Sequence, residues 1–250
     1  ILINEKIKKE YTRFKTERQL MLNKYPNTII SNIINSFMNP EIPEGVKFIA
    51  NTEIVDTLFD YFYFKNHYWD KFHFEDNRLA HTPLLDYKID QYFKYVMPIP
   101  DSFIKEADIL LEKSRNSKEL FKYFLHWTTN YTYSSKVMGM DEAFVHLISN
   151  YHMKGDAYWL DEKQVQKYIQ EAQKIAPNMI GMKGKDIPLV DLFTLKPNNL
   201  YDLKAPYTVL VIWKPDCGHC RTEIPKLDSV YNARLKQYGT QIFSVPGKTA

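Results

Sequence analysis

The chain has 250 residues, which is enough for one large domain or two ordinary ones. Its content of 44% hydrophobic and 25% charged residues is typical of a globular protein, and no apolar run reaches the ~18 residues of a membrane span. The net charge is only +3, with lysine and glutamate interleaved, which argues against a nucleic-acid-binding protein.

Helical periodicity dominates the first ~176 residues. Apolar side chains recur at helical spacing over residues 1–22, 28–37, 54–62, 84–93, 103–111, 120–128, 144–151 and 165–176. The expected N-caps are Asn51, Asp101 or Ser102, a residue near Asp141, and Asp161 in a capping box with Gln164. Strand-like alternation is absent before about residue 187, so we predict an all-α domain over residues 1–176.

The densest aromatic stretch of the sequence runs from Tyr61 to Asp70. It is compatible with a helix that packs on two sides, because Tyr and Phe bury a large area per residue. It is also compatible with an aromatic recognition surface for a peptide or a sugar. Burial of these rings decides between the two interpretations.

Glycine and proline concentrate over residues 177–186, which we interpret as a linker. Beyond it we expect a strand over Leu189–Phe193, a turn over Lys196–Asn199, a strand over Tyr207–Trp213, a helix that ends before Gly239, and a strand over Thr240–Val245. Because the run ending at Trp213 is apolar on both faces, we expect it to be a central strand covered by helices. The fold class predicted is α + α/β, with a right-handed βαβ unit within residues 187–250.

Cys217 and Cys220 are the only cysteines, three positions apart between a buried strand and a helix. This spacing suits reversible disulfide chemistry, because the N-terminus of a helix favours a thiolate over a thiol. We expect Cys217 to be the exposed nucleophile and the more shielded Cys220 to resolve the mixed disulfide. Between them, His219 is expected to add positive charge near the sulfur and make the pair more oxidising.

A structural disulfide and a zinc site are the alternatives for these cysteines. A bridge between residues this close constrains the unfolded chain little and would stabilise it little. Structural zinc needs four ligands, and a second cysteine pair is absent from the sequence. The nearest other candidates are histidines of the helical region, which are expected to be structural or surface residues: His67, His73, His81, His126, His146 and His152. We therefore expect neither a metal nor a cofactor.

Residues from about 184 to 245 resemble the TlpA-type, thioredoxin-like thiol–disulfide oxidoreductases of bacterial cell envelopes. The family pattern has a Trp four residues before the first Cys, a CxxC pair, a Glu three residues after it and a Pro two beyond. Trp213, Cys217, Cys220, Glu223 and Pro225 match this pattern.

The resemblance implies a role for each of these residues. Glu223 would assist proton transfer at the second thiol, although a solvated helix carboxylate is the other interpretation. Pro225 would kink the active-site helix, and Trp213 would pack beneath the site. The Gly218-His219 pair is similar to that of protein disulfide isomerases, which implies a less strongly reducing pair.

One departure from the family concerns the proline that faces the cysteines in cis. Pro246 follows Cys217 too closely to be that residue and is interpreted as an ordinary proline. The resemblance implies that the cis-proline, two further strands and a final helix lie beyond residue 250. The resemblance therefore implies the activity for the longer protein and not for residues 1–250 by themselves.

The segments Phe62–Asp70 and Lys136–Asp141 resemble an uncharacterised helical domain that precedes thioredoxin-like domains in envelope proteins of Bacteroidetes-type bacteria. The resemblance implies a periplasmic or envelope location; the sequence starts within a helical pattern and so carries no information about a leader. We expect an enzyme that exchanges disulfides with protein thiols. The alternative is a helical partner-binding or scaffold module with a vestigial or regulatory redox domain.

Overall fold

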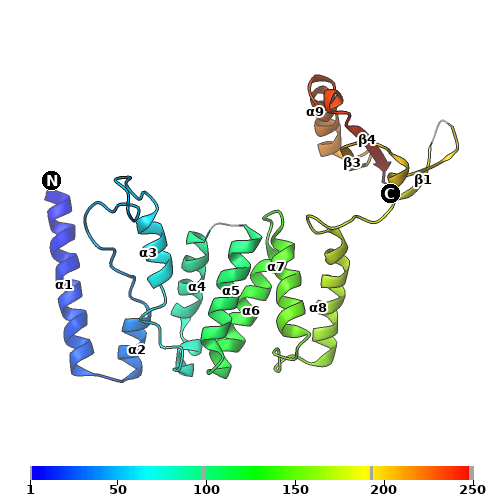
Figure 1. Cartoon of the computed structure of the whole chain (residues 1–250). Coiled ribbons are helices and arrows are strands. Elements are labelled where there is room, and N and C mark those ends of the chain that lie inside the picture. The colour runs from blue at the N-terminus through cyan, green and yellow to red at the C-terminus, as the bar shows by residue number, and fades with distance from the viewer. Residues whose placement is uncertain (1, 97–98, 192–193, 248–250) are drawn as a thin grey trace. The chain divides into compact units, whose positions relative to one another are not determined.

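The computed structural model describes residues 2–96, 99–191 and 194–247. The chain divides into two compact units, Ile1–Met182 and Lys183–Ala250, at a point within the segment expected to be a linker (Figure 1). All of the described strands lie in the second unit, apart from a single bridge between Phe48 and Val55. The content of helix and strand agrees with a mixed α and β class.

Eight α-helices form the frame of the first unit in the residues that the structure describes. They are α1 (Leu2–Lys24), α2 (Ile29–Ser36), α3 (Phe59–His67), α4 (Pro83–Tyr95), α5 (Pro100–Ser114), α6 (Lys118–Ser134), α7 (Met140–Leu147) and α8 (Glu162–Ile175). Shorter turns are the 3-10 helices Asn77–His81 and Ala176–Asn178 and a π-helical turn over Ile148–His152. The helices follow one another in chain order, and α5, α6 and α7 pack pairwise (Figure 1).

The ends of these helices follow local chemistry. The predicted capping box of α8 is confirmed, since the Asp161 carboxylate accepts from Gln164 N–H at 2.7 Å and the Gln164 side chain accepts from Asp161 N–H. For α5, however, neither Asp101 nor Ser102 is the N-cap. The helix begins one residue earlier, at Pro100, whose fixed φ and missing N–H suit the first helical position.

The cap predicted near Asp141 is Gly139, and helix α7 begins at Met140. Gly139 has a φ of 83°, which glycine adopts without strain. Asn51, by contrast, does not cap a helix, because α3 begins only at Phe59. Asn51 has a φ of 62° in a tight loop, which is closed by the bridge between Phe48 and Val55.

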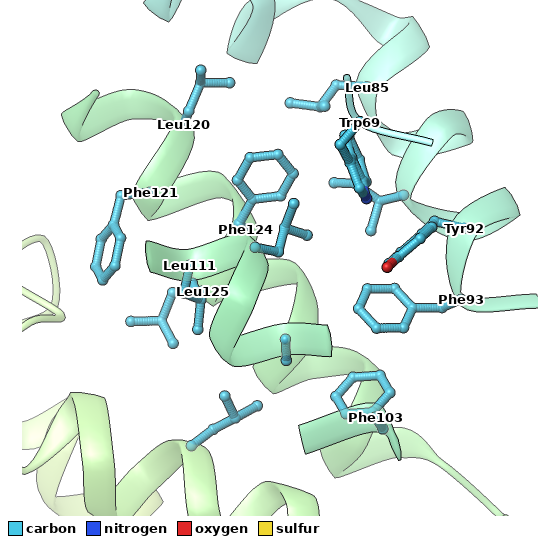
Figure 2. Packing of buried hydrophobic residues seen from close by; sticks show 14 of the residues in the cluster. Trp69, Leu85, Tyr92, Phe93, Phe103, Leu111, Leu120, Phe121, Phe124 and Leu125 are labelled. Atoms are coloured by element: carbon cyan, nitrogen blue, oxygen red, sulfur yellow. The ribbon is translucent and has the colours of Figure 1, made fainter. Parts of the chain in front are cut away.

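The core of the first unit is mainly aromatic, and Figure 2 shows its centre. Trp69 meets Phe72, Tyr92 and Phe124 edge-on, with ring centroids 5.2–5.9 Å apart. Such edge-to-face contacts stabilise a core beyond the area they bury. Of the aromatic stretch singled out in the sequence, Tyr68 and Trp69 lie in this core, whereas Phe62 is 47% exposed. These two residues follow the end of α3 at His67, and no residue of α3 itself is buried, so the burial lies in the turn after the helix and not on the helix.

Buried polar groups connect the helices around this core. Lys65 Nζ of α3 lies 2.5 Å from Glu106 Oε1 of α5, and the Tyr92 hydroxyl of α4 donates to the other oxygen of Glu106. Beside them, the Lys88 ammonium lies over the Tyr68 ring, 4.1 Å from its centroid, and donates to the Tyr68 carbonyl. Burial lowers the pKa of Lys88 to about 8.

The described residues of the second unit form two small sheets. The hairpin of β1 (Pro188–Val190) and β2 (Pro197–Asn199) is antiparallel. The expected turn at Lys196–Asn199 is therefore wrong over its last three residues, because these form β2, and Asp191 N–H donates to the Lys196 carbonyl at 2.9 Å before it. The first expected strand is present over Pro188–Val190, and its last two residues, 192 and 193, lie outside the described part.

The other sheet pairs β3 (Thr208–Trp213) with β4 (Gln241–Pro246) in parallel, and helix α9 (Gly218–Ala233) connects them. A 3-10 helix, Leu235–Tyr238, ends at Gly239, whose φ of 69° confirms the expected C-terminal glycine. The expectation that β3 is covered on both faces is wrong for the described residues. Its side chains alternate, and Ile212 is 69% exposed.

His152, in the π-helical turn, provides a test of the fold. Its ring is 3% exposed, Nε2 lies 3.0 Å from Thr129 Oγ1, and Nδ1 has no hydrogen-bond partner within the described ranges. Burial, with a smaller contribution from the charge of His126, lowers the pKa of His152 to about 4. The folded protein therefore holds this imidazole neutral under conditions in which the unfolded chain binds a proton.

We expect the free energy of unfolding to be unaffected by His152 above pH 6.5 and to fall as the pH drops from 6.5 toward 4. Between pH 7 and 5 the loss should be roughly 2 kcal/mol, because the unfolded state alone is protonated there. Urea unfolding at both pH values checks this expectation. The loss should be smaller in His152→Gln and unchanged in His81→Gln, an exposed control. Equal losses in all three proteins would contradict it.

Candidate active site around the two cysteines

The local sequence places Cys217 at the N-terminus of a helix. Strand β3 ends at Trp213, and the chain turns through Lys214–Asp216, with Cys217 N–H donating to the Lys214 carbonyl at 3.2 Å. Arg221 Nε bonds the Pro215 carbonyl at 3.2 Å and holds this turn against α9. Cys217 itself is the N-cap residue of α9, with extended backbone angles.

The sulfur of Cys217 takes the position that a Ser or Asp oxygen has in an ordinary N-cap. Cys217 Sγ accepts the backbone N–H of Cys220 at 3.4 Å. The Cys220 thiol, and then this N–H, hold the pKa of Cys217 below its usual value; the His219 N–H adds to the effect and the Asp216 carboxylate opposes it. A thiolate on Cys217 is therefore favoured by donors of its own helix.

Cys217 and Cys220 are both free thiols and both half-buried. The structure therefore does not show the expected difference in solvent exposure between a nucleophilic Cys217 and a more shielded, resolving Cys220. What distinguishes the two sulfurs is position: Cys217 precedes the first helical turn, and Cys220 is inside it. The hydrogen bond from Cys220 N–H brings the two residues together in the way that the CxxC spacing predicts.

The other residues of the motif are arranged around this turn. Trp213 is half-buried, and its Nε1 donates to Ser244 Oγ of β4 at 2.8 Å. Gly218 and His219 are exposed, and it is the backbone N–H of His219, rather than the imidazole, that lowers the pKa of Cys217. Pro225 lies inside α9, where its ring cannot donate to the carbonyl of the preceding turn.

Glu223 lies one turn beyond Cys220 and is exposed. Its Oε1 accepts from Lys226 Nζ at 2.7 Å, an exposed pair three residues apart on α9. Glu223 and Cys220 nevertheless line the same groove, so the carboxylate opens onto the space beside the second thiol.

This groove has a volume of about 480 Å³ and runs between α9 and β3. Its lining is mainly apolar and consists of Val211, Ile212, Trp213, His219, Cys220, Glu223, Ile224, Lys226, Leu227 and Val230. A second hollow of about 250 Å³ shares Trp213 and Ile224 and reaches β4. An open apolar surface of this kind commonly marks a site of protein or ligand association.

Within the described residues, no three His, Cys, Asp or Glu side chains are grouped so that they could hold a metal ion. Several of the scattered histidines are paired within the helical unit instead. His67 contacts Asp70 at 2.6 Å, and His146 contacts Asp108 at 3.0 Å.

Sequence reasoning missed three residues near the cysteines. Lys226 could have been found, because i,i+3 spacing on a helix brings Glu and Lys together. Asp216 is adjacent to Cys217 in the sequence, so its opposing charge could also have been anticipated. Ser244 could not have been found from the sequence, because its contact with Trp213 depends on the register of β3 and β4.

Two comparisons place the chain among known proteins, and no curated protein matches the sequence. A crystal structure of a thioredoxin-like protein from Bacteroides caccae ATCC 43185 matches 86% of this chain and 75% of its own, with 20% identity and a TM-score of 0.61. At this identity the likeness supports a thioredoxin-like fold. Among the described helices, none is long and apolar enough to cross a bilayer.

The other comparison concerns the helical unit. The family model for a domain of unknown function, DUF5106, matches residues 5–178, which is well over half of the chain. The helices α2 to α8 and nearly all of α1 lie within that match. The chain therefore belongs to the DUF5106 family.

Proposed function

We propose that this chain is a TlpA-type thiol–disulfide oxidoreductase of the bacterial cell envelope that exchanges disulfides with protein partners through Cys217 and Cys220. One observation carries the proposal: Cys217 Sγ sits at the N-cap of α9 and accepts the Cys220 N–H at 3.4 Å. The thioredoxin-like fold of the structural relative supports it. The chemistry needs no cofactor, because both electrons are carried by the sulfurs.

The reaction follows from the order of the two thiols along the helix. The Cys217 thiolate attacks one sulfur of a partner disulfide, forms a mixed disulfide, and releases the other partner sulfur as a thiolate that takes up a proton. Cys220 loses its proton and attacks Cys217 Sγ. The partner leaves with both of its cysteines reduced, and the chain keeps a Cys217–Cys220 disulfide. The reverse sequence oxidises a partner dithiol.

The remaining residues of the motif support these two steps. Glu223 is proposed to take the proton of Cys220, since it lines the groove beside that thiol. Lys226 holds the Glu223 carboxylate, and Trp213 fixes the end of β3 through Ser244. Gly218 and His219 supply the first turn of α9, and Pro225 leaves a carbonyl of this helix without its usual donor.

The helical unit suggests a second candidate function, a partner-binding or scaffold module with a vestigial or regulatory redox unit. The observation in its favour is the loop before α3, where Val46, Phe48, Ile54 and Leu58 are each more than half exposed. Apolar surface of this kind commonly marks a site of protein association. If this function holds, a partner remains bound to Cys217→Ser without a covalent bond, and Phe48→Ser releases it.

The pKa of the Cys217 thiol tests whether its surroundings favour a thiolate, as the proposed function requires. We expect Cys217 to titrate below the ordinary thiol pKa of about 8.5. Cys220→Ala should raise this pKa, because it removes the largest favourable contact, and Asp216→Asn should lower it, because it removes the opposing charge. The pH dependence of alkylation, resolved by residue with mass spectrometry, measures both changes. An ordinary titration that neither substitution shifts would contradict the assignment.

Trapping tests the proposed reaction. Cys220→Ser removes the resolving thiol, so the mixed disulfide on Cys217 should accumulate instead of turning over. Non-reducing electrophoresis of the chain with a disulfide-bonded protein substrate should show a complex that a reductant dissolves. Cys217→Ser is the matched control and should trap nothing. Equal trapping by both variants, or none by either, would exclude the proposed order of attack.

A further inference from the structure

A pocket in the helical unit, far along the sequence from the cysteines, contains more cations than its acidic groups can pair. It has a volume of about 340 Å³ and lies between α1, the loop after α2, and α3. Its lining is Lys15, Arg18, Gln19, Met38, Pro40, Glu41, Tyr63, His67, Asp70 and Lys71. Helical spacing places Lys15, Arg18 and Gln19 on one face of α1.

The lysine and arginine side chains of this pocket outnumber its carboxylates, three against two. Glu41 pairs with Lys15 at 2.7 Å, and the Asp70 carboxylate contacts the His67 ring at 2.6 Å. That leaves Arg18 and Lys71, for which no carboxylate lies within 4.0 Å in the part of the chain that the structure describes. Two cations in one pocket without acidic partners favour an anionic ligand, and an Arg guanidinium binds carboxylate or phosphate through two parallel hydrogen bonds.

Glu41 shows that this pocket already accommodates a carboxylate. Its two oxygens contact Lys15 Nζ at 2.7 and 2.8 Å. Hydrogen bonding and charge from Lys15, with smaller contributions from Lys71 and Arg18, lower the pKa of Glu41. The field of all three cations therefore acts at the position of an oxyanion.

The volume and the lining of this pocket limit the kind of ligand that it can hold. A water molecule occupies about 30 Å³ of liquid, so the pocket has room for about ten waters, or for one small organic molecule. Met38, Pro40 and the Tyr63 ring provide apolar walls beside the cations. The Tyr63 ring is itself positioned by the His67 ring, 4.2 Å away.

We propose that the pocket between α1 and α3 binds a small organic anion with two or more carboxylate or phosphate groups, held chiefly by Arg18 and Lys71. One anionic group would bridge these two cations, and a second would compete with Glu41 for Lys15. This site is independent of the redox chemistry at Cys217, so either function can hold without the other.

The test is calorimetric titration of the whole chain at low salt with citrate and, separately, with inorganic phosphate. Saturable binding of citrate supports a carboxylate ligand, and tighter binding of phosphate supports a phosphate-bearing one. Each of Arg18→Gln and Lys71→Gln should weaken binding about threefold to fivefold, as expected for loss of one exposed ion pair. Added salt should weaken it further by screening the charges.

Two variants distinguish specific binding of the anion in this pocket from general electrostatic attraction of anions to a basic surface. Glu41→Gln should strengthen binding severalfold, because it frees Lys15 and removes the resident negative charge. Lys9→Gln removes one positive charge from an exposed position of α1 outside the pocket and should leave binding unchanged. Absence of saturable binding would overturn the proposal, as would equal weakening by Lys9→Gln and Arg18→Gln. Circular dichroism of each variant verifies that it is folded.

Discussion

A buried carboxylate on α5 constrains the arrangement of the helical unit. Glu106 is 8% exposed and is bonded both to the Lys65 ammonium of α3 and to the Tyr92 hydroxyl of α4. A buried charge without partners is costly, so α3 and α4 cannot move away from α5 without exposing or abandoning it. The hydrophobic effect itself has no preferred direction, so these polar contacts orient the helices in a way that burial of apolar area alone does not. Glu106 thereby fixes the rotation of α3, whose Tyr63 and His67 form one wall of the proposed anion site.

In the second unit, a hydrogen bond likewise determines the environment of a sulfur at the end of a helix. The first turn of any helix has N–H groups without helical partners, and here one of them donates to Cys217 Sγ. The acidity of this thiol is set by a balance, since the Cys220 and His219 groups favour the thiolate and Asp216 opposes it. Such a balance allows the redox potential to change through a neighbouring residue while the CxxC pair stays the same.

The sequence was most informative where a local rule acts alone. The capping box at Asp161, the helix that begins after Cys217, and the left-handed Gly239 all depend on neighbours within a few residues. The predictions that were wrong or missing concern residues whose structure depends on contacts with distant parts of the chain. The apolar residues from Ile54 to Leu58 have helical spacing, yet they belong to a loop and to the turn before α3, because a bridge between Phe48 and Val55 closes this segment. The pairing of Trp213 with Ser244 likewise depends on strand register, which the motif does not contain.

The exposed face of β3 has a consequence for the behaviour of this chain in solution. The segment Thr208–Trp213 combines high β-propensity with no charge and no proline, and Leu210 and Ile212 of its outer face are exposed. Six uncharged residues of this kind match the composition of segments that nucleate cross-β assemblies. In the described part of the chain, β4 pairs along one edge of β3 and no strand pairs along the other. Lys214 directly follows the segment and can act as a gatekeeper, so replacing this charged residue by a neutral one would favour stacking of copies through the open edge.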